Sequence, residues 1–131
     1  MVLPADTPRI VAYFFVQNAQ AFIEFTQQAF AAEELGREEA QGMIRNAQLR
    51  ILDCTFMVSE ATEIGPLQQS HYLYVDDVDH TLEQALKAGA ECLFDAEDMP
   101  YGDRQGGIKD PFGNYWWVSK RLTEEPYYPL G

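Results

Sequence analysis

The chain has 131 residues, of which 47% are hydrophobic, and its formal net charge is −12 at pH 7. This length and composition predict a folded chain with one sizeable core. The negative charge argues against nucleic acid and anionic membranes as partners, because both would repel the surface. A solubilising surface explains the charge more simply than a cationic partner does.

Targeting and redox signals are weak. The N-terminal residues 1–6 contain no basic region and no apolar signal core, and no apolar run is long enough to span a bilayer. Cys54 and Cys92 lie far apart and form no Cys-x-x-Cys pair. We therefore expect two buried, reduced thiols in a cytoplasmic protein.

A first set of elements is predicted by the N-terminal half. The apolar run 10–16 is typical of a strand, and Asn18 can cap the helix that follows it. Apolar or small residues recur in that helix at helical spacing: Ala19, Phe22, Ile23, Thr26, Ala29 and Phe30. Three strands are expected next, near residues 33–36, 43–51 and 54–59.

The C-terminal half predicts the same order of elements. A strand over 70–75 leads to a helix that Asp77 or Asp79 can cap, and Gly89 suits the position just after its end. The expected apolar stripe of this helix is Leu82, Ala85 and Leu86. Strands then follow near 91–94, 104–109 and 115–119.

The two halves also resemble each other in sequence. Residues 16–20 match residues 75–79 at an offset of 59, and residues 56–59 match 116–119 at an offset of 60. We predict an α+β fold of two tandem βαβββ modules, forming a curved mixed sheet around a cavity with the helices on the outer face. The whole chain is one domain with four parts: module one at about 8–60, a linker at 61–69, module two at about 70–122, and an extended C-terminal arm at 123–131.

The segment 110–114, Asp-Pro-Phe-Gly-Asn, predicts a tight turn that leads into the aromatic strand 115–118. Together with the segments 75–79, 88–90 and 101–104, it makes the chain resemble the vicinal oxygen chelate superfamily. That superfamily contains glyoxalases, bleomycin-resistance proteins and dioxygenases, and the resemblance is to its glyoxalase-like branch. It covers roughly residues 8 to 122.

The resemblance implies four metal-ligand positions, which members with a metal fill with His or Glu. In this sequence they are Val11, Met57, Ser70 and Trp117. None of these side chains is a useful ligand for zinc, nickel, iron or manganese. We therefore expect no metal and no other cofactor, and we lean away from an enzyme.

His71 stands next to one of these positions. A shift of one residue along a strand turns a side chain to the opposite face, so strand alternation opposes a ligand role. We expect a packed, hydrogen-bonded histidine. His80 belongs to the first turn of the second helix and is expected to face solvent.

Strand alternation assigns an aromatic set with polar tips to the face that the helices leave open. The candidate ligand-binding residues on this face and its mouth are Tyr13, Phe15, Asn46, Gln48, Arg50, Met57, Ser70, Tyr72, Tyr101, Tyr115 and Trp117. Such a set suits a ligand cavity. The same face could instead pack against the other module or a second subunit, since Tyr and Trp are common at interfaces. For Asp103 the alternative to a place at the cavity mouth is a structural salt bridge.

Three functions remain open at this point. The first is a metal-free protein that binds a small aromatic or cationic molecule as a homodimer, for drug or metabolite sequestration. The second is a glyoxalase-type lyase or isomerase with non-standard catalytic residues. The third is a dimeric scaffold or sensor module without a ligand.

Overall fold

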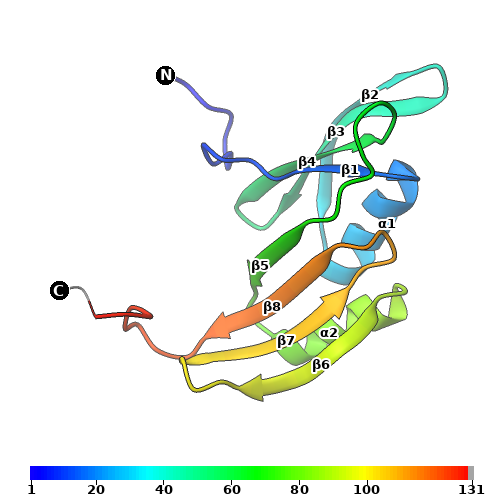
Figure 1. Cartoon of the computed structure of the whole chain (residues 1–131). Helices are drawn as coiled ribbons and strands as arrows, with labels where there is room; N and C mark the ends of the chain where they lie inside the picture. Colours follow the sequence, from blue (N-terminus) through cyan, green and yellow to red (C-terminus); the bar gives the residue numbers. More distant parts are fainter. Residues whose placement is uncertain (130–131) are drawn as a thin grey trace. The chain divides into compact units, whose positions relative to one another are not determined.

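A computed structural model describes residues 1–129, which form two compact units, 1–68 and from 69 onward (Figure 1). Each unit contains four strands and one helix. In chain order the elements are β1 (Tyr13–Val16), α1 (Ala19–Phe30), β2 (Glu33–Ala40), β3 (Met43–Ile51), β4 (Cys54–Glu60), β5 (Ser70–Tyr74), α2 (Val78–Lys87), β6 (Glu91–Asp98), β7 (Asp103–Lys109) and β8 (Tyr115–Arg121).

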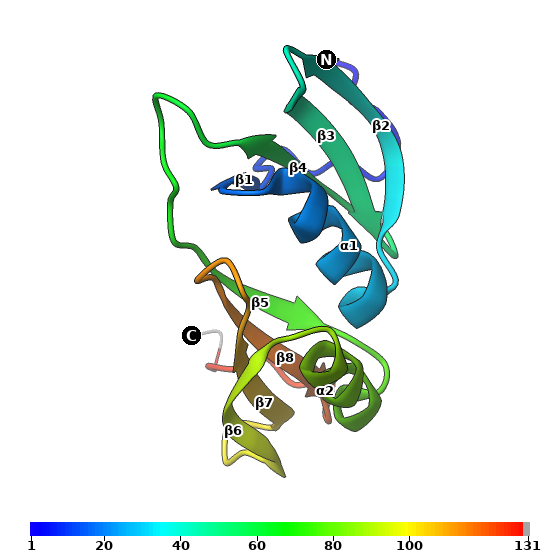
Figure 2. The same cartoon turned by 90° about the vertical axis from the view of Figure 1, so that its right-hand side faces the viewer.

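The two sheets have the same topology. Their strand orders are β1-β4-β3-β2 and β5-β8-β7-β6. In each sheet the first strand pairs in parallel with the last, and the other neighbours are antiparallel. Figure 2 shows each helix against one face of its own sheet. The predicted α+β class and the two tandem βαβββ modules are therefore confirmed.

Helix α1 begins where two carboxyl or amide groups satisfy its first N–H groups. The Asn18 side chain accepts from the Ala21 N–H at 3.1 Å, as the sequence predicts for a cap. The Glu60 carboxylate, at the end of β4, accepts from the N–H groups of Asn18 and Ala19 at 2.8 Å each. These bonds tie the start of the helix to the strand on which its apolar face packs.

Helix α2 is capped by Asp77, whose carboxylate accepts from the His80 N–H at 3.0 Å. The side chains of Val78, Leu82 and Ala85 are buried, and the helix contacts β6, β7 and β8. Leu86 was also expected in the apolar stripe, but it is exposed. No helix within residues 1–129 is long and apolar enough to cross a membrane.

The turn at 110–114 is held by the buried carboxylate of Asp110. This carboxylate accepts from the backbone N–H groups of Phe112 and Asn114, both at 2.9 Å, and from the Asn114 side-chain amide at 3.2 Å. The Trp116 indole donates a fourth hydrogen bond at 2.9 Å. The Asn114 side chain in turn accepts from the Gln69 N–H at 2.8 Å. The turn therefore fixes both the end of the linker and the start of β8.

Two expectations are corrected. The first strand begins at Tyr13 rather than Ile10, whose side chain is 90% exposed. Both cysteines are free, as expected, but they are exposed rather than buried. Cys54 is the first residue of β4, and Cys92 is the second residue of the edge strand β6.

Candidate functional site

The open face of the first unit carries six of the predicted site residues. Tyr13, Met57 and Gln48 lie side by side across β1, β4 and β3. The Tyr13 and Phe15 rings stack with centroids 4.6 Å apart. The Tyr13 hydroxyl is 2.6 Å from the Ser59 hydroxyl and accepts from the Asn46 amide at 3.2 Å. Two of the predicted residues, Tyr13 and Asn46, are therefore in direct hydrogen-bond contact.

Asn46 and Gln48 also line a shallow pocket of about 340 Å³ beside β2, together with residues 35–38. Arg50, the sixth predicted residue, lies farther along β3 and forms ion pairs with Asp6 at 3.3 Å and Glu33 at 2.9 Å. Its charge is therefore engaged by carboxylates of the same unit.

The second unit repeats the polar trio of the first. Tyr72 and Ser119 are hydrogen-bonded, and the Gln105 amide donates to the Ser119 hydroxyl at 2.8 Å. These three residues correspond to Tyr13, Ser59 and Asn46 at offsets of 59, 60 and 59. The duplication thus preserves a Tyr, Ser and amide arrangement on the open face of both sheets.

A buried carboxylate distinguishes the second unit from the first. The Asp103 side chain is fully buried at the start of β7 and accepts from the hydroxyls of Tyr72 at 2.5 Å and Tyr127 at 2.6 Å. Arg121 donates to it at 3.0 Å. The residue at the same offset in the first unit is Ile44, so this cluster belongs to the second unit alone. The salt-bridge alternative for Asp103 is confirmed.

These contacts fix the protonation of the cluster. Burial would raise the pKa of Asp103, but the hydrogen bonds from Tyr127, Tyr72 and Arg121 outweigh it, and the pKa lies below its usual value. Burial and the nearby Asp103 raise the pKa of both Tyr72 and Tyr127. At neutral pH the carboxylate is therefore ionised and both phenols keep their protons.

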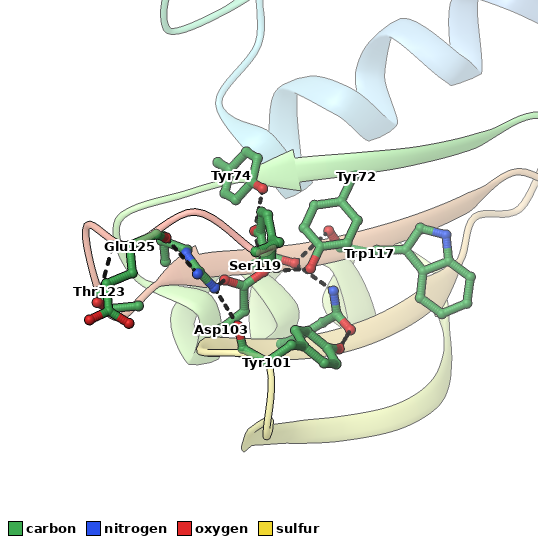
Figure 3. Close-up of polar contacts among 11 residues, drawn as sticks. Tyr72, Tyr74, Tyr101, Asp103, Trp117, Ser119, Thr123 and Glu125 are labelled. Carbon is green, nitrogen blue, oxygen red and sulfur yellow. Dashed lines mark hydrogen bonds and ion pairs between the residues drawn. The ribbon is translucent and has the colours of Figure 1, made fainter. Parts of the chain in front are cut away.

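Around this cluster lies a pocket of about 510 Å³. Its lining consists of five tyrosines: Tyr72, Tyr74, Tyr101, Tyr127 and Tyr128. Figure 3 shows Tyr72, Tyr74 and Tyr101 around Asp103 and Ser119, with Trp117 to one side. Of the five, the candidate set contained Tyr72 and Tyr101, and the structure brings these two together.

The other predicted residues of the second unit lie nearer the turn. The Trp117 indole donates to the Ser70 hydroxyl at 2.7 Å. Tyr115 is the register partner of Ser70, and the Lys109 ammonium lies 5.8 Å from its ring centroid. His71 is half-buried, and its Nε2 is 2.5 Å from the Gln69 side-chain oxygen, so it is packed and hydrogen-bonded as expected. Burial lowers the pKa of His71.

The donor set does not fit a metal. Val11 has no donor atom, Met57 offers a thioether, and Ser70 accepts the indole N–H of Trp117. An indole N–H has no lone pair to give a cation. Within residues 1–129, no three His, Cys, Asp or Glu side chains are grouped in a way that could hold a metal ion.

Several residues of the tyrosine pocket were not in the candidate set. Tyr74 follows the same strand alternation as Tyr72 and could have been included. Tyr127 and Tyr128 lie in the C-terminal arm, and the sequence gives no local signal that the arm folds back onto the sheet. Residues 130–131 of the arm lie outside the described residues.

The duplicated βαβββ fold agrees with the family that the sequence matches. The model of the Glyoxalase/Bleomycin resistance protein/Dioxygenase superfamily matches residues 9–118, and the chain belongs to this superfamily. It is 35% identical to an uncharacterized protein of Mycobacterium bovis, over 94% of this chain and 87% of that protein. An uncharacterized protein of Mycobacterium tuberculosis is also 35% identical, over 94% of this chain and 78% of its own length.

Solved structures share the fold at lower identity. TioX from Micromonospora superimposes with a TM-score of 0.75 at 24% identity, covering 88% of this chain and 99% of that one. A gene product from Arabidopsis thaliana gives a TM-score of 0.72 at 19% identity, covering 86% and 98%. The fosfomycin resistance protein FosX from Listeria monocytogenes gives 0.70 at 14% identity, covering 89% and 95%.

Proposed function

We propose that this protein binds a small organic molecule in the tyrosine pocket of its second unit and needs no metal to do so. The observation that carries the proposal is the cavity of about 510 Å³ lined by five tyrosines. This volume lies in the range of small-molecule sites, which combine apolar walls with a few fixed polar groups. Contiguous aromatic surface left exposed on a soluble protein is typical of an interaction site.

The metal-free part of the proposal rests on the chemistry of the four family ligand positions. Val11, Met57, Ser70 and Trp117 supply no imidazole, carboxylate or thiolate. The resistance protein FosX shows that the same fold serves a protein directed against a drug. Sequestration of a drug or metabolite is therefore the role that we propose, with the fold as an analogy only.

Titration with neutral, cationic and anionic aromatic compounds, followed by tryptophan fluorescence, tests ligand binding. We expect saturable quenching by at least one class, because Trp117 is the register partner of Tyr72. The variant Trp117→Phe assigns the signal to this indole rather than to the buried Trp116. A flat response from every compound would contradict the proposal and favour the scaffold or sensor function.

Elemental analysis of protein purified without a metal-binding tag tests the second part. We expect zinc, nickel, iron and manganese far below one ion per chain. One bound ion per chain would contradict the assignment of the ligand positions and support the glyoxalase-type lyase or isomerase instead.

We further propose a cytoplasmic homodimer. The two free cysteines suit a reducing compartment, and dimers are common in this superfamily. Light scattering measures the mass in solution, where twice the chain mass of 14.9 kDa is expected. A monomer at all concentrations would contradict the dimer without affecting the ligand proposal.

A further inference from the structure

The walls of the tyrosine pocket come from three segments of the second unit. Tyr72 and Tyr74 project from β5, and their ring centroids are 5.3 Å apart. Tyr101 lies in the turn before β7, and Tyr127 and Tyr128 lie in the C-terminal arm. Tyr127 and Tyr128 of the arm are therefore part of the pocket lining.

The tyrosine hydroxyls of the pocket are already bonded to protein groups. Those of Tyr72 and Tyr127 donate to Asp103, and that of Tyr101 donates to the Gln105 side-chain oxygen. The Tyr74 hydroxyl is hydrogen-bonded to that of Tyr127. The hydroxyl protons of these four residues are therefore all engaged by protein acceptors, and none is left to donate to a ligand. The faces of the rings remain available for contact with a ligand.

Ring faces carry the negative end of the aromatic quadrupole and attract cations. One ring of the pocket already holds a cation, because the Arg121 guanidinium lies 3.9 Å from the centroid of Tyr127. That guanidinium also donates to Asp103 and to the carbonyl oxygens of Tyr101 and Glu125, so its donors face protein acceptors. An anion would meet ring faces on a protein of net charge −12.

We propose that the tyrosine pocket is an aromatic cage for an organic cation, such as a quaternary ammonium or an N-alkylated heteroaromatic ring. Tyr127 and Tyr128 of the C-terminal arm form one wall of this cage, and Asp103 is the positioning residue that holds this part of the arm through Tyr127. This inference rests on the proposed function, because it names the class of ligand that the same pocket takes.

Three probes of similar size separate charge from shape: N-methylquinolinium, neutral quinoline, and naphthalene-2-carboxylate. Calorimetric titration at pH 8 and constant ionic strength gives the dissociation constant of each. We expect the cation to bind about 3- to 30-fold more tightly than the neutral probe, as cation–π attraction predicts, and the anion to bind worst. Equal affinity of cation and neutral probe, or a preference for the anion, would overturn the cage.

A matched pair at Tyr101 separates the ring from the hydroxyl. Tyr101→Phe keeps the ring face, so its affinity for the cation should stay within about twofold of the original protein. Tyr101→Leu removes the face and should lose about 3- to 10-fold for the cation, with a smaller loss for quinoline. Phe112→Leu removes a ring of the same unit that does not line the pocket and serves as the control. An equal loss in Tyr101→Phe and Tyr101→Leu would contradict binding through the ring.

A separate variant tests the role of the arm. Tyr127→Phe keeps the ring but removes the hydroxyl that binds Asp103. We expect faster amide exchange in residues 124–128 and weaker binding of the cation, in contrast to Tyr101→Phe. Unchanged exchange and unchanged affinity would contradict the positioning by Asp103.

The outcomes distinguish this inference from the proposed function. If no probe of any charge binds, both fail. If quinoline or the carboxylate binds best, the pocket is a small-molecule site but not a cation cage. If Tyr101→Leu turns a dimer into a monomer and leaves the affinity for the cation unchanged, the tyrosines form a surface between copies and the cage is wrong.

Discussion

The indole N–H of Trp117 donates a hydrogen bond to the Ser70 hydroxyl, 2.7 Å away, between the parallel strands β8 and β5. The family resemblance implies that both residues stand at positions which metal-binding members fill with ligands. Here the two side chains bind each other, and the Ser70 hydroxyl oxygen accepts the N–H of the indole. Tyr72 and Tyr74, which line the tyrosine pocket, lie farther along β5.

Replacing Ser70 by alanine removes the acceptor of this bond. Because the pair is exposed, water can take the place of the hydroxyl, and we expect a loss of about 0.5–1 kcal/mol in the free energy of unfolding. Urea unfolding of Ser70→Ala, Trp117→Phe and the double variant measures the coupling between the two side chains. Strictly additive losses would show that the hydrogen bond contributes nothing to stability.

The turn at 110–114 gives a larger effect. The buried Asp110 carboxylate accepts four N–H groups, and an asparagine would turn its own NH₂ toward some of them. We expect Asp110→Asn to lose about 3 kcal/mol, since buried donors would be left without acceptors. The exposed Asp76→Asn makes the same change of charge and is the control. Similar denaturation midpoints for the two variants would refute this account of the turn.

Whether a feature could be predicted from the sequence depends on how far apart its interacting residues lie along the chain. Asn18 and Asp77 cap their helices through bonds to residues three positions away, and the Asp110 turn closes within six residues, so local chemistry predicts all three. The alternation that separates Trp116 from Trp117 is equally local. Together with the internal repeat and the family resemblance, these features predicted the fold.

The site depends on longer connections. Tyr127 binds Asp103 across 24 residues, and no periodicity in the arm predicts that its tyrosine returns to β7. The exposure of Cys92 was also missed, because its residue type favours burial although it lies on the edge strand β6. The duplicated trio could have been found by aligning Asn46 with Gln105, but its hydrogen bonds required coordinates.

Gly107 allows a test of side-chain packing in the second sheet. A Cβ added at Gly107 would collide with the Phe94 ring, which lies 5.8 Å from the Trp117 ring by centroids. We expect Gly107→Ala to lose about 1–3 kcal/mol through overpacking, and Phe94→Leu in the same chain to recover part of it. At Gly36 in β2 an added Cβ meets nothing within 4 Å, so Gly36→Ala is the matched control and should be close to neutral. Equal losses for the two alanines would point to backbone effects rather than to Phe94.

The final prediction concerns the acid dependence of stability. The pKa of Asp103 is lowered in the fold from its usual value of 3.8, because three hydrogen-bond donors outweigh the effect of burial. A lowered carboxyl pKa means that the folded state binds the proton less readily than the unfolded state does. The ionised Asp103 therefore adds stability above pH 3.8, and this stability is lost as the pH falls through the lower folded value.

The variant Asp103→Asn removes the contribution of Asp103 to the pH dependence of stability. At neutral pH it should lose about 3 kcal/mol, because the Arg121 guanidinium loses its buried partner. As the pH falls below 3.8, the difference from the original protein should shrink, since the original protein loses its own carboxylate there. Asp79, whose pKa is lowered chiefly by its hydrogen bond with Arg104, is exposed, so Asp79→Asn should have a smaller effect that added salt removes. The check is the urea midpoint of all three proteins at several pH values between neutral and about pH 2. If the difference in midpoint between Asp103→Asn and the original protein stays constant across this range, Asp103 is not the titrating group.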